Sequence, residues 1–402
     1  MSSCPIPDMN IPGGFHWSAV KAGIKASGKP DVAFAEAPLG ASAAAVFTKN
    51  RVCAAPLVVD RENLAKSKGR IRAVLVNAGN ANCATGKPGL AAARATCAAV
   101  GKALTAAPEF IFPSSTGIIG VPLPIEKLVA AIPLAVRERA GDQASVQAFA
   151  EAIMTTDTRP KTATAAFERK GHKVSLLGMA KGSGMIHPNM ATMLVYIFTD
   201  IEATPRELQK QLNATVSTTF NAISVDGDTS TNDTVLVLAS GASGIRLDKS
   251  TEKAFAAALL EVCASLAEQV VVDGEGAKHL VRLNIEQAKS TEEARQIARS
   301  IANSPLVKTA WAGSDPNWGR ILSSIGKSGV DVDPAKVNIF IGRQQVCKKG
   351  MANAFDEQAA HETMKQPDFD IRVQLGRGKA ALKFLTCDLT AEYVRINADY
   401  ST

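Results

Sequence analysis

The residues with the clearest chemical potential lie in one segment near the middle of the chain, between Leu176 and Phe198. A glycine-bearing stretch at 181–184 leads to the turn-forming His187-Pro188-Asn189 and then to Thr192, which directly precedes an apolar run. This order places Thr192 at the mouth of a buried strand. The plainest interpretation is a loop that feeds a core strand, with threonine present for its β propensity.

A second interpretation makes Thr192 a nucleophile. Its hydroxyl needs a base, and no nearby pattern of histidine and aspartate supplies one. Cleavage of the chain before Thr192 would supply it, because a free α-amino group, with a pKa of about 7.7 to 8, accepts the proton of its own hydroxyl. The same hydroxyl can first attack the carbonyl of Ala191 in an N-to-O acyl shift, so that the residue releases itself.

Motifs along the rest of the chain extend this interpretation. The segment KGSGMIHPNMATML resembles the signature of the glutamate N-acetyltransferase (ornithine acetyltransferase) family, whose members cleave themselves and act in arginine biosynthesis. Further runs match the family in order: SSTGIIG (114–120), IMTTDT (153–158), VDGDTSTNDT (225–234), VVDGEGA (271–277), DPNWGR (315–320) and EYVRINADYST (392–402). By this resemblance the chain is identified as a member of that family.

The resemblance implies two chains and a catalytic centre. Residues 1–191 would form an α chain and residues 192–402 a β chain, with the cut between Ala191 and Thr192. Thr192 would be both the autoproteolytic and the catalytic nucleophile. Thr116 and Gly117 match the family's oxyanion stabilisers, and a glycine lets a backbone N–H approach a developing negative charge closely. Taken alone, SSTGIIG would be a plain strand-to-helix turn.

The substrate contacts that the resemblance implies suit an amino acid. They fall on Thr155, with Thr156 as the neighbouring alternative, and on Lys181, Thr192, Glu275, Asn397 and Thr402. Lys181 suits a carboxylate and Glu275 a side-chain ammonium, while Asn397 and the Thr402 terminus offer hydrogen bonds. Without the resemblance each would be ordinary: a lysine on a solvated loop, a glutamate in a glycine turn and a frayed end.

The implied reaction is a ping-pong transfer of an acetyl group. Thr192 would take the acetyl group from N2-acetylornithine, release ornithine and pass the group to glutamate, giving N-acetylglutamate, with no cofactor and no metal. Some family members also use acetyl-CoA as the donor, and no feature of the sequence decides this. Two other classes stay open: an aminopeptidase or amidase with water as the acceptor, and an uncleaved metabolite-binding protein. The resemblance also implies an α2β2 assembly.

Composition narrows the class of protein. The chain has 402 residues, 46% hydrophobic and 21% charged, which is typical of folded globular proteins. The net charge is +7, but the longest basic cluster is only Lys348-Lys349, so we expect no nucleic-acid partner. Seven scattered cysteines without a CxxC pair indicate reduced thiols. Without a signal-like segment or a run of about eighteen apolar residues, we expect a cytoplasmic protein with no membrane span.

Short β-branched runs alternate with alanine-rich helical stretches, which is typical of a mixed α/β (α+β) protein. We expect strands near 43–50, 71–79, 110–120, 192–201, 233–240, 279–288 and 336–342, and helices near 89–104, 204–223 and 252–271. Residues 369–389 are expected to form a hairpin that turns at Gly376 and Gly378. The family's fold is similar to the αββα sandwich of N-terminal nucleophile hydrolases: layered sheets covered by helices, with both chains sharing one core.

Overall fold

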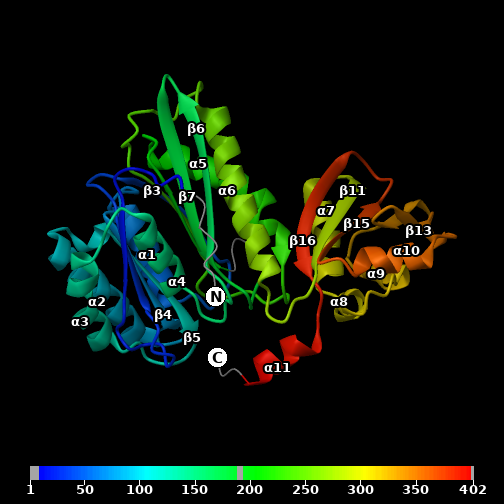
Figure 1. The fold of residues 1–402 in the computed structure, drawn as a ribbon, viewed down its shortest axis with the longest axis horizontal. Coiled ribbons are helices and arrows are strands. Elements are labelled where there is room, and N and C mark those ends of the chain that lie inside the picture. Colours follow the sequence, from blue (N-terminus) through cyan, green and yellow to red (C-terminus); the bar gives the residue numbers. More distant parts are fainter. Residues whose placement is uncertain (1–8, 188–192, 400–402) are drawn as a thin grey trace.

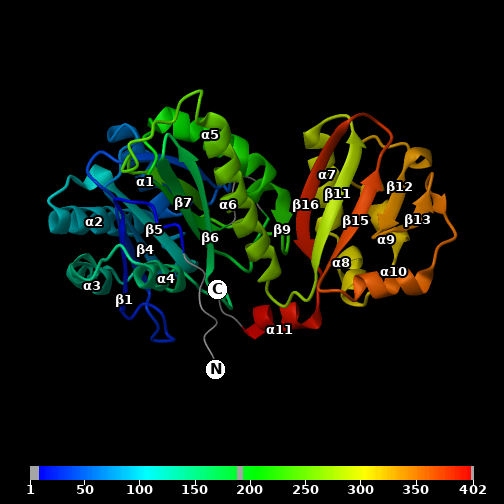
Figure 2. The ribbon, with the colours of Figure 1, turned by 45° about the horizontal axis from the view of Figure 1, so that its top comes forward.

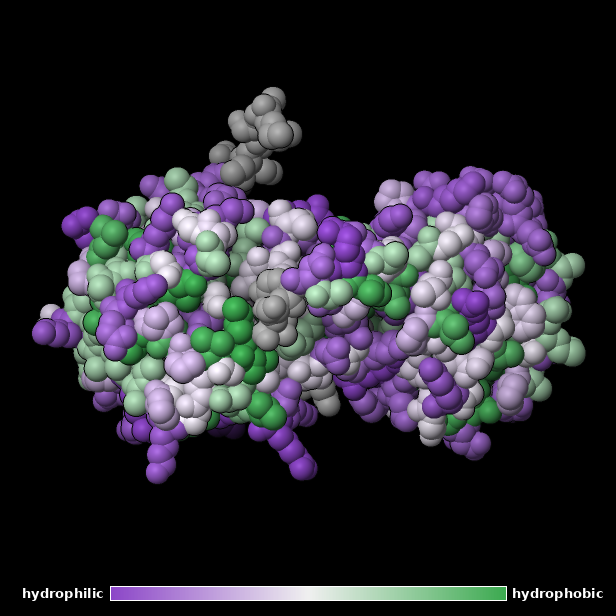
Figure 3. Space-filling view, turned by 90° about the horizontal axis from the view of Figure 1, so that it is seen from below, coloured by the Kyte–Doolittle hydropathy of each residue, from purple (hydrophilic) through white to green (hydrophobic). Residues whose placement is uncertain are grey.

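The structure is a computed structural model that describes residues 9–187 and 193–399. It has two lobes of unequal size (Figure 1). The larger lobe holds two sheets and the smaller lobe a third, and α11 (Ala391–Asp399) leaves the smaller lobe and runs back below the junction. Figure 3, a view from below, shows polar side chains gathered at the narrower region between the lobes.

The first sheet contains four strands in the order β1 (His16–Val20), β2 (Val32–Glu36), β4 (Ala73–Asn80) and β5 (Ile111–Ile118). β4 and β5 are parallel, whereas the other neighbours are antiparallel. β5 is an edge strand, which accommodates Pro113 because proline has no N–H to donate to a ladder. The outer face of this sheet packs against α1 (Ala55–Lys66), α2 (Gly86–Leu104) and α3 (Ile125–Arg137).

The second sheet has the order β3 (Ser42–Phe47), β10 (Thr234–Ala239), β8 (Leu194–Thr199), β7 (His172–Lys181) and β6 (Lys161–Arg169). Every residue of β8 is buried, because alternate side chains face the first sheet and the helices on the other side. Those helices are α5 (Pro205–Thr218) and α6 (Glu252–Val272).

The two sheets of the larger lobe pack face to face. An apolar cluster from both sheets and from α4 (Gln143–Ala152) fills the space between them, with Trp17, Tyr196 and Phe198 among its largest side chains. Further apolar clusters lie between each sheet and its own helices. The layer order is therefore helix, sheet, sheet, helix, which confirms the predicted αββα sandwich.

α6 is also the only helix within the described ranges that is long and apolar enough to cross a membrane. Its buried side chains include Phe255, Leu259 and Val262, and they pack in the cluster that covers β6 and β7. Half of its most apolar 18-residue stretch is buried. α6 is therefore apolar because it packs in the core of the larger lobe.

The smaller lobe was not predicted as a separate unit. Its sheet has the order β14 (Met351–Ala352), β13 (Gln344–Lys348), β12 (Asn338–Ile341), β15 (Asp368–Gln374), β11 (Leu280–Ala288), β16 (Ala380–Cys387) and β9 (Ile223–Ser224). The main helices of the lobe are α7 (Thr291–Ala302), α8 (Pro305–Ala312), α9 (Trp318–Gly326) and α10 (Glu357–Met364) (Figure 2). Short 3-10 turns occupy Pro108–Phe110, Phe220–Ala222 and Pro334–Lys336.

The hairpin expected at 369–389 is wrong. β15 and β16 form as predicted, but β11 lies between them and pairs with both. The connection crosses the end of β11, where the N–H groups of Arg377 and Gly378 donate to the carbonyl of Gln287 at 2.8 and 2.9 Å. The glycines therefore serve the passage over a third strand, and at Gly378 a Cβ would overlap the Ala288 carbonyl.

Candidate active site

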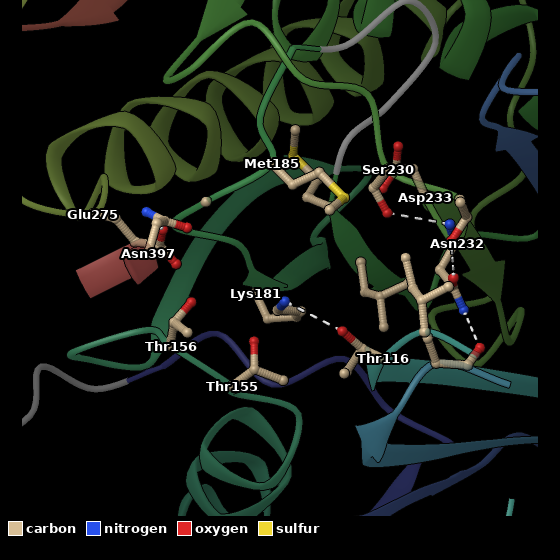
Figure 4. A pocket seen from close by; sticks show the side chains of 17 residues that line it. Thr116, Thr155, Thr156, Lys181, Met185, Ser230, Asn232, Asp233, Glu275 and Asn397 are labelled. Atoms are coloured by element: carbon tan, nitrogen blue, oxygen red, sulfur yellow. Dashed lines mark hydrogen bonds between the residues drawn. The ribbon is translucent and has the colours of Figure 1, made fainter. Parts of the chain in front are cut away.

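A cavity opens at the ends of β5, β7 and β8, where the two sheets of the larger lobe meet (Figure 4). Its walls contain six of the predicted site residues: Thr116, Gly117, Thr155, Lys181, Glu275 and Asn397. Thr156, the alternative to Thr155, lines it as well. Ala191, Thr192 and Thr402 lie outside the described residues, but Met193 and Leu194, the residues that follow Thr192, are part of the wall. Segments far apart in sequence thus converge on one cavity.

Lys181 is the cation of the cavity wall. It is the last residue of β7, on the face from which Leu177 and Met179 point at the first sheet. Its ammonium group therefore reaches the end of β5, where Nζ donates to Thr116 Oγ1 at 3.2 Å (Figure 4). A lysine in this place can hold a substrate carboxylate next to the predicted oxyanion pair.

Thr116 and Gly117 lie at the end of β5, where Gly117 pairs with Gly79 of β4. Gly117 has φ +130°, a conformation that is nearly exclusive to glycine. A Cβ at this position would overlap Gly79 and come within 2.5 Å of the Asn80 nitrogen. The local backbone geometry thus requires glycine at 117. A backbone N–H that must approach a substrate oxygen closely also favours glycine, which has no side chain in the way.

A buried carboxylate, Asp157, joins two walls of the cavity. Its Oδ1 accepts from Gly182 N at 2.6 Å and from Lys161 Nζ at 2.7 Å, and its Oδ2 accepts from Thr155 N at 3.0 Å. Burial raises the pKa of Asp157, but Lys181 and Lys161 outweigh it and bring the pKa down to about 2. Asp157 is therefore ionised, and it ties the segment of Thr155 to that of Lys181.

Glu275 supplies the negative charge on the other side of the cavity. Its N–H donates to the Ser183 carbonyl at 2.9 Å, and its carboxylate packs directly on Gly184. Asn397, on α11, donates from Nδ2 to Glu275 Oε2 at 2.9 Å. Figure 4 shows this pair on one side of the cavity and Lys181 in the middle. An ammonium and a carboxylate thus face the same space, which suits a zwitterionic amino acid.

Residues 230–233, which were not predicted as site residues, also line the cavity. Asp233 is 2% exposed, and its Oδ2 has no hydrogen-bond partner among the described residues. Burial raises the pKa of this carboxyl well above its usual range, against the opposing effects of Ser230 and Lys181. The sequence signal for these residues is the run VDGDTSTNDT, which contains all four of them but does not indicate a function for any one of them.

The chain that leads into the predicted cleavage point is anchored by a second carboxylate. Asp226 accepts from Met185 N at 2.6 Å and from Ile186 N at 2.9 Å. The next residue, His187, has Nδ1 3.2 Å from both Ser224 Oγ and Asn303 Nδ2. Burial lowers the pKa of His187 to about 4, and Arg299 acts in the same direction, so the imidazole is neutral at pH 7.

The chemical groups of the cavity suit acyl transfer. They comprise a cation, an anion, several hydroxyls and a glycine with a positive φ at the end of an edge strand. Across 9–187 and 193–399, no three His, Cys, Asp or Glu side chains are grouped closely enough to hold a metal ion. A sandwich of this kind with such a cavity defines an α/β enzyme suited to acyl transfer on an amino acid.

Comparison with known proteins agrees with this class. The ArgJ family model matches residues 16–402. The arginine biosynthesis bifunctional protein ArgJ of Methylococcus capsulatus is 45% identical over 99% of this chain and 96% of its own, and that of Bradyrhizobium diazoefficiens is 44% identical over 98% and 97%. The chain therefore belongs to the ArgJ family and is an acyltransferase, which confirms the resemblance seen in the motifs.

Two solved structures at 37–40% identity each match about half of the chain. The crystal structure of the arginine biosynthesis bifunctional protein argJ from Bacillus halodurans has a TM-score of 0.50 and 40% identity. It covers 51% of this chain and 98% of its own. The ornithine acetyltransferase of Mycobacterium tuberculosis, complexed with ornithine, has a TM-score of 0.40 and 37% identity, and covers 46% of this chain and 98% of its own.

Proposed function

We propose that the protein is a self-cleaving acetyltransferase that moves the acetyl group of N2-acetylornithine to glutamate through an acetyl-Thr192 intermediate. The observation that carries this proposal is the cavity. It collects six predicted site residues from five separate segments, together with Met193, which is bonded covalently to Thr192. Chance placement of these residues would have scattered them over the surface.

Self-cleavage is the first step of the proposed mechanism. Thr192 Oγ attacks the carbonyl carbon of Ala191, the peptide C–N bond breaks, and the nitrogen takes a proton to become the α-amino group of Thr192. Water then hydrolyses the ester, which leaves fragments 1–191 and 192–402. One comparison supports a cut near the middle: 98% of the Bacillus halodurans crystal chain aligns with only 51% of this chain, although full-length relatives align with nearly all of it.

Acetyl transfer follows at the same hydroxyl. The α-amino group of Thr192 accepts the hydroxyl proton while Oγ attacks the acetyl carbonyl of N2-acetylornithine. Thr116 and Gly117 stabilise the oxyanion, the C–N bond breaks, and the proton moves to the departing amine of ornithine. The amine of glutamate then attacks the acetyl ester, and the proton returns to Oγ. Bonds and protons balance over the cycle without a cofactor.

The charges of the cavity set the orientation of the substrate. We assign the substrate carboxylate to Lys181 and the side-chain ammonium of ornithine to Glu275, with Asn397 and Thr402 completing that end.

The relatives are named bifunctional, and we propose that the second activity is the acetylation of glutamate with acetyl-CoA as the donor. Acetylation of glutamate in a mixture with acetyl-CoA but without N2-acetylornithine tests this assignment. We further propose that the enzyme is cytoplasmic and forms an α2β2 assembly.

Denaturing intact-mass measurement before and after brief exposure to N2-acetylornithine tests the mechanism directly. We expect two fragments that meet between Ala191 and Thr192, with the second gaining one acetyl group. An intact chain that never gains acetyl would contradict the proposal and favour a binding protein. Rapid release of acetate without dependence on glutamate would favour the amidase instead.

The variant Thr192→Ala isolates the hydroxyl. We expect an uncut chain of 402 residues with no transferase activity, because neither the acyl shift nor the acetyl ester can form. Thr309→Ala, which removes an exposed hydroxyl on α8, is the matched control and should be cut and active. Normal cleavage of Thr192→Ala would disprove the assignment.

A further inference from the structure

The side chain of Asn232 crosses from the second sheet to the predicted oxyanion residues of the first. It lies just before β10 and is 5% exposed. Its Nδ2 donates to the carbonyls of Ala81 at 2.6 Å and Ser115 at 2.8 Å, and its Oδ1 accepts from Thr231 Oγ1 at 2.6 Å. Both amide hydrogens therefore have partners, and the amide has one defined orientation.

One of the two carbonyls that Asn232 binds, that of Ser115, directly precedes the predicted oxyanion pair. The Ser115 carbonyl and the Thr116 N–H belong to the same planar peptide, so a bond that fixes one fixes the other. Ala81, the second partner, donates its own N–H to the Ile118 carbonyl at 2.9 Å. Thr116 and Gly117 thus lie between the carbonyls of Ser115 and Ile118. Asn232 binds the Ser115 carbonyl directly, and it is linked to the Ile118 carbonyl through Ala81.

We propose that Asn232 is the positioning residue that sets the Thr116–Gly117 donors in place for the oxyanion. The inference rests on the function proposed above and adds a residue that the motif match left without a role. Asn232 follows the predicted cut, whereas Ser115 and Ala81 precede it, so the second fragment orients the donors of the first. Asn232 also lines the cavity, and we assign its effect to these two carbonyls and not to contact with the substrate.

The geometry predicts a specific kinetic signature. An oxyanion exists only in the transition state and the tetrahedral intermediate, so misplaced donors slow the chemical step and leave substrate binding almost unchanged. Loss of a direct oxyanion donor costs about 100- to 1,000-fold in rate, and we expect about 10- to 100-fold for donors that are displaced but present. A purely structural residue would lower stability without this separation.

Asn63 provides a matched control. It is also a buried asparagine, 7% exposed, and its Nδ2 also donates to two backbone carbonyls, those of Ile111 at 2.8 Å and Pro108 at 3.2 Å. These carbonyls lie at the opposite end of β5 from Thr116. Asn63→Ala therefore removes bonds of the same kind from the same strand, at a distance from the oxyanion pair.

The test is the rate of acetyl-Thr192 formation, followed by quenched intact mass over a series of N2-acetylornithine concentrations. Asn232→Ala should lower the limiting rate about 10- to 100-fold, with the half-saturating concentration within about threefold of the wild type. Asn63→Ala should match the wild type in both, with a comparable loss of thermal stability. Asn232→Asp, which turns a carboxylate toward two carbonyl oxygens, should be slower than Asn232→Ala.

Each outcome decides something. If the wild type forms acetyl-enzyme and Asn232→Ala behaves like Asn63→Ala, Asn232 has no positioning role. If the wild type forms no acetyl-enzyme, the proposed function fails and this inference fails with it. If Asn232→Ala and Asn232→Asp do not fold, Asn232→Ser carries the same test, because its single O–H cannot donate to both carbonyls, and an unchanged limiting rate there would overturn the inference.

Discussion

At the scale of single residues, the cavity depends on charges that are buried but paired. Lys161 is 0% exposed and donates to Asp157 at 2.7 Å and to Asp273 at 2.5 Å. A buried charge of this kind is tolerated only when its partners are in place. Asp157 also receives the Gly182 and Thr155 N–H groups, so the same carboxylate serves both the ion pair and the cavity wall.

Asp157→Asn should therefore destabilise the fold and disturb the site together. Removing one partner of a buried ion pair costs about 3 to 5 kcal/mol, and we expect a loss of that order in the free energy of unfolding at pH 7. Urea titration followed by circular dichroism measures it. Asp142→Asn is the control: Asp142 caps α4 on the surface, and asparagine caps a helix equally well, so its midpoint should not move. Equal midpoints for the two variants would contradict the assigned role of Asp157.

The pKa of Asp157 also predicts how stability changes with pH. The folded-state pKa of about 2 lies below the ordinary value of 3.8, so the unfolded chain binds the proton more readily between these values. The stabilisation is complete above about pH 4 and is lost as the pH falls toward about 2. Over that window the unfolding midpoint of the wild type should fall more steeply than that of Asp157→Asn. Parallel curves would show that Asp157 does not carry the shift.

At the scale of elements, the ends of β4 and β5 are shaped by glycines that face each other. Gly117→Ala would force a side chain into the backbone of Gly79 at a φ that alanine does not adopt. We expect the two strand ends to separate and the rate of acetylation to fall by at least about 100-fold, the effect of losing an oxyanion donor. Intact mass after exposure to N2-acetylornithine measures this loss.

Gly171→Ala separates the overlap from ordinary backbone strain. Gly171 also has a positive φ, +75°, but it lies in the turn between β6 and β7, and nothing is within 4 Å of the position of a Cβ. This variant should lose about 1 to 2 kcal/mol of stability, because alanine is strained at a positive φ, and should keep the acetylation rate. If both variants retained full activity, Gly117 would have no part in oxyanion stabilisation.

The positions of single helices and strands could be predicted from the sequence, but the order of the strands in a sheet could not. β8, β10 and α6 form where uninterrupted apolar runs or a long helical window indicated them, because burial on both faces leaves a local mark in the sequence. The insertion of β11 between β15 and β16 leaves no such mark. The role of Asn232 could not be predicted for the same reason. The two carbonyls that accept its hydrogen bonds lie 151 and 117 residues away in the sequence, and local spacing carries no information on such distant contacts.

At the scale of the whole molecule, the predicted cut falls inside a shared sheet. β7 ends at Lys181 and β8 begins at Leu194, and the two strands pair side by side in the second sheet. β3, from the first part of the chain, pairs in the same way with β10 from the second. The core between the sheets also draws side chains from both parts, including Phe112 and Phe198. Separation would break two strand pairings and expose that core.

We therefore expect the two fragments to remain together after cleavage and to part only when the fold is lost. Size-exclusion chromatography with light scattering should give the same native mass for the cleaved wild type and for uncut Thr192→Ala. In urea the cleaved protein releases one more chain per unit, so dilution should lower its midpoint more steeply, by about 1.4 kcal/mol of stability per tenfold. Fragments that separate in buffer, or identical dilution slopes for the two proteins, would contradict a core built from both sides of the cut.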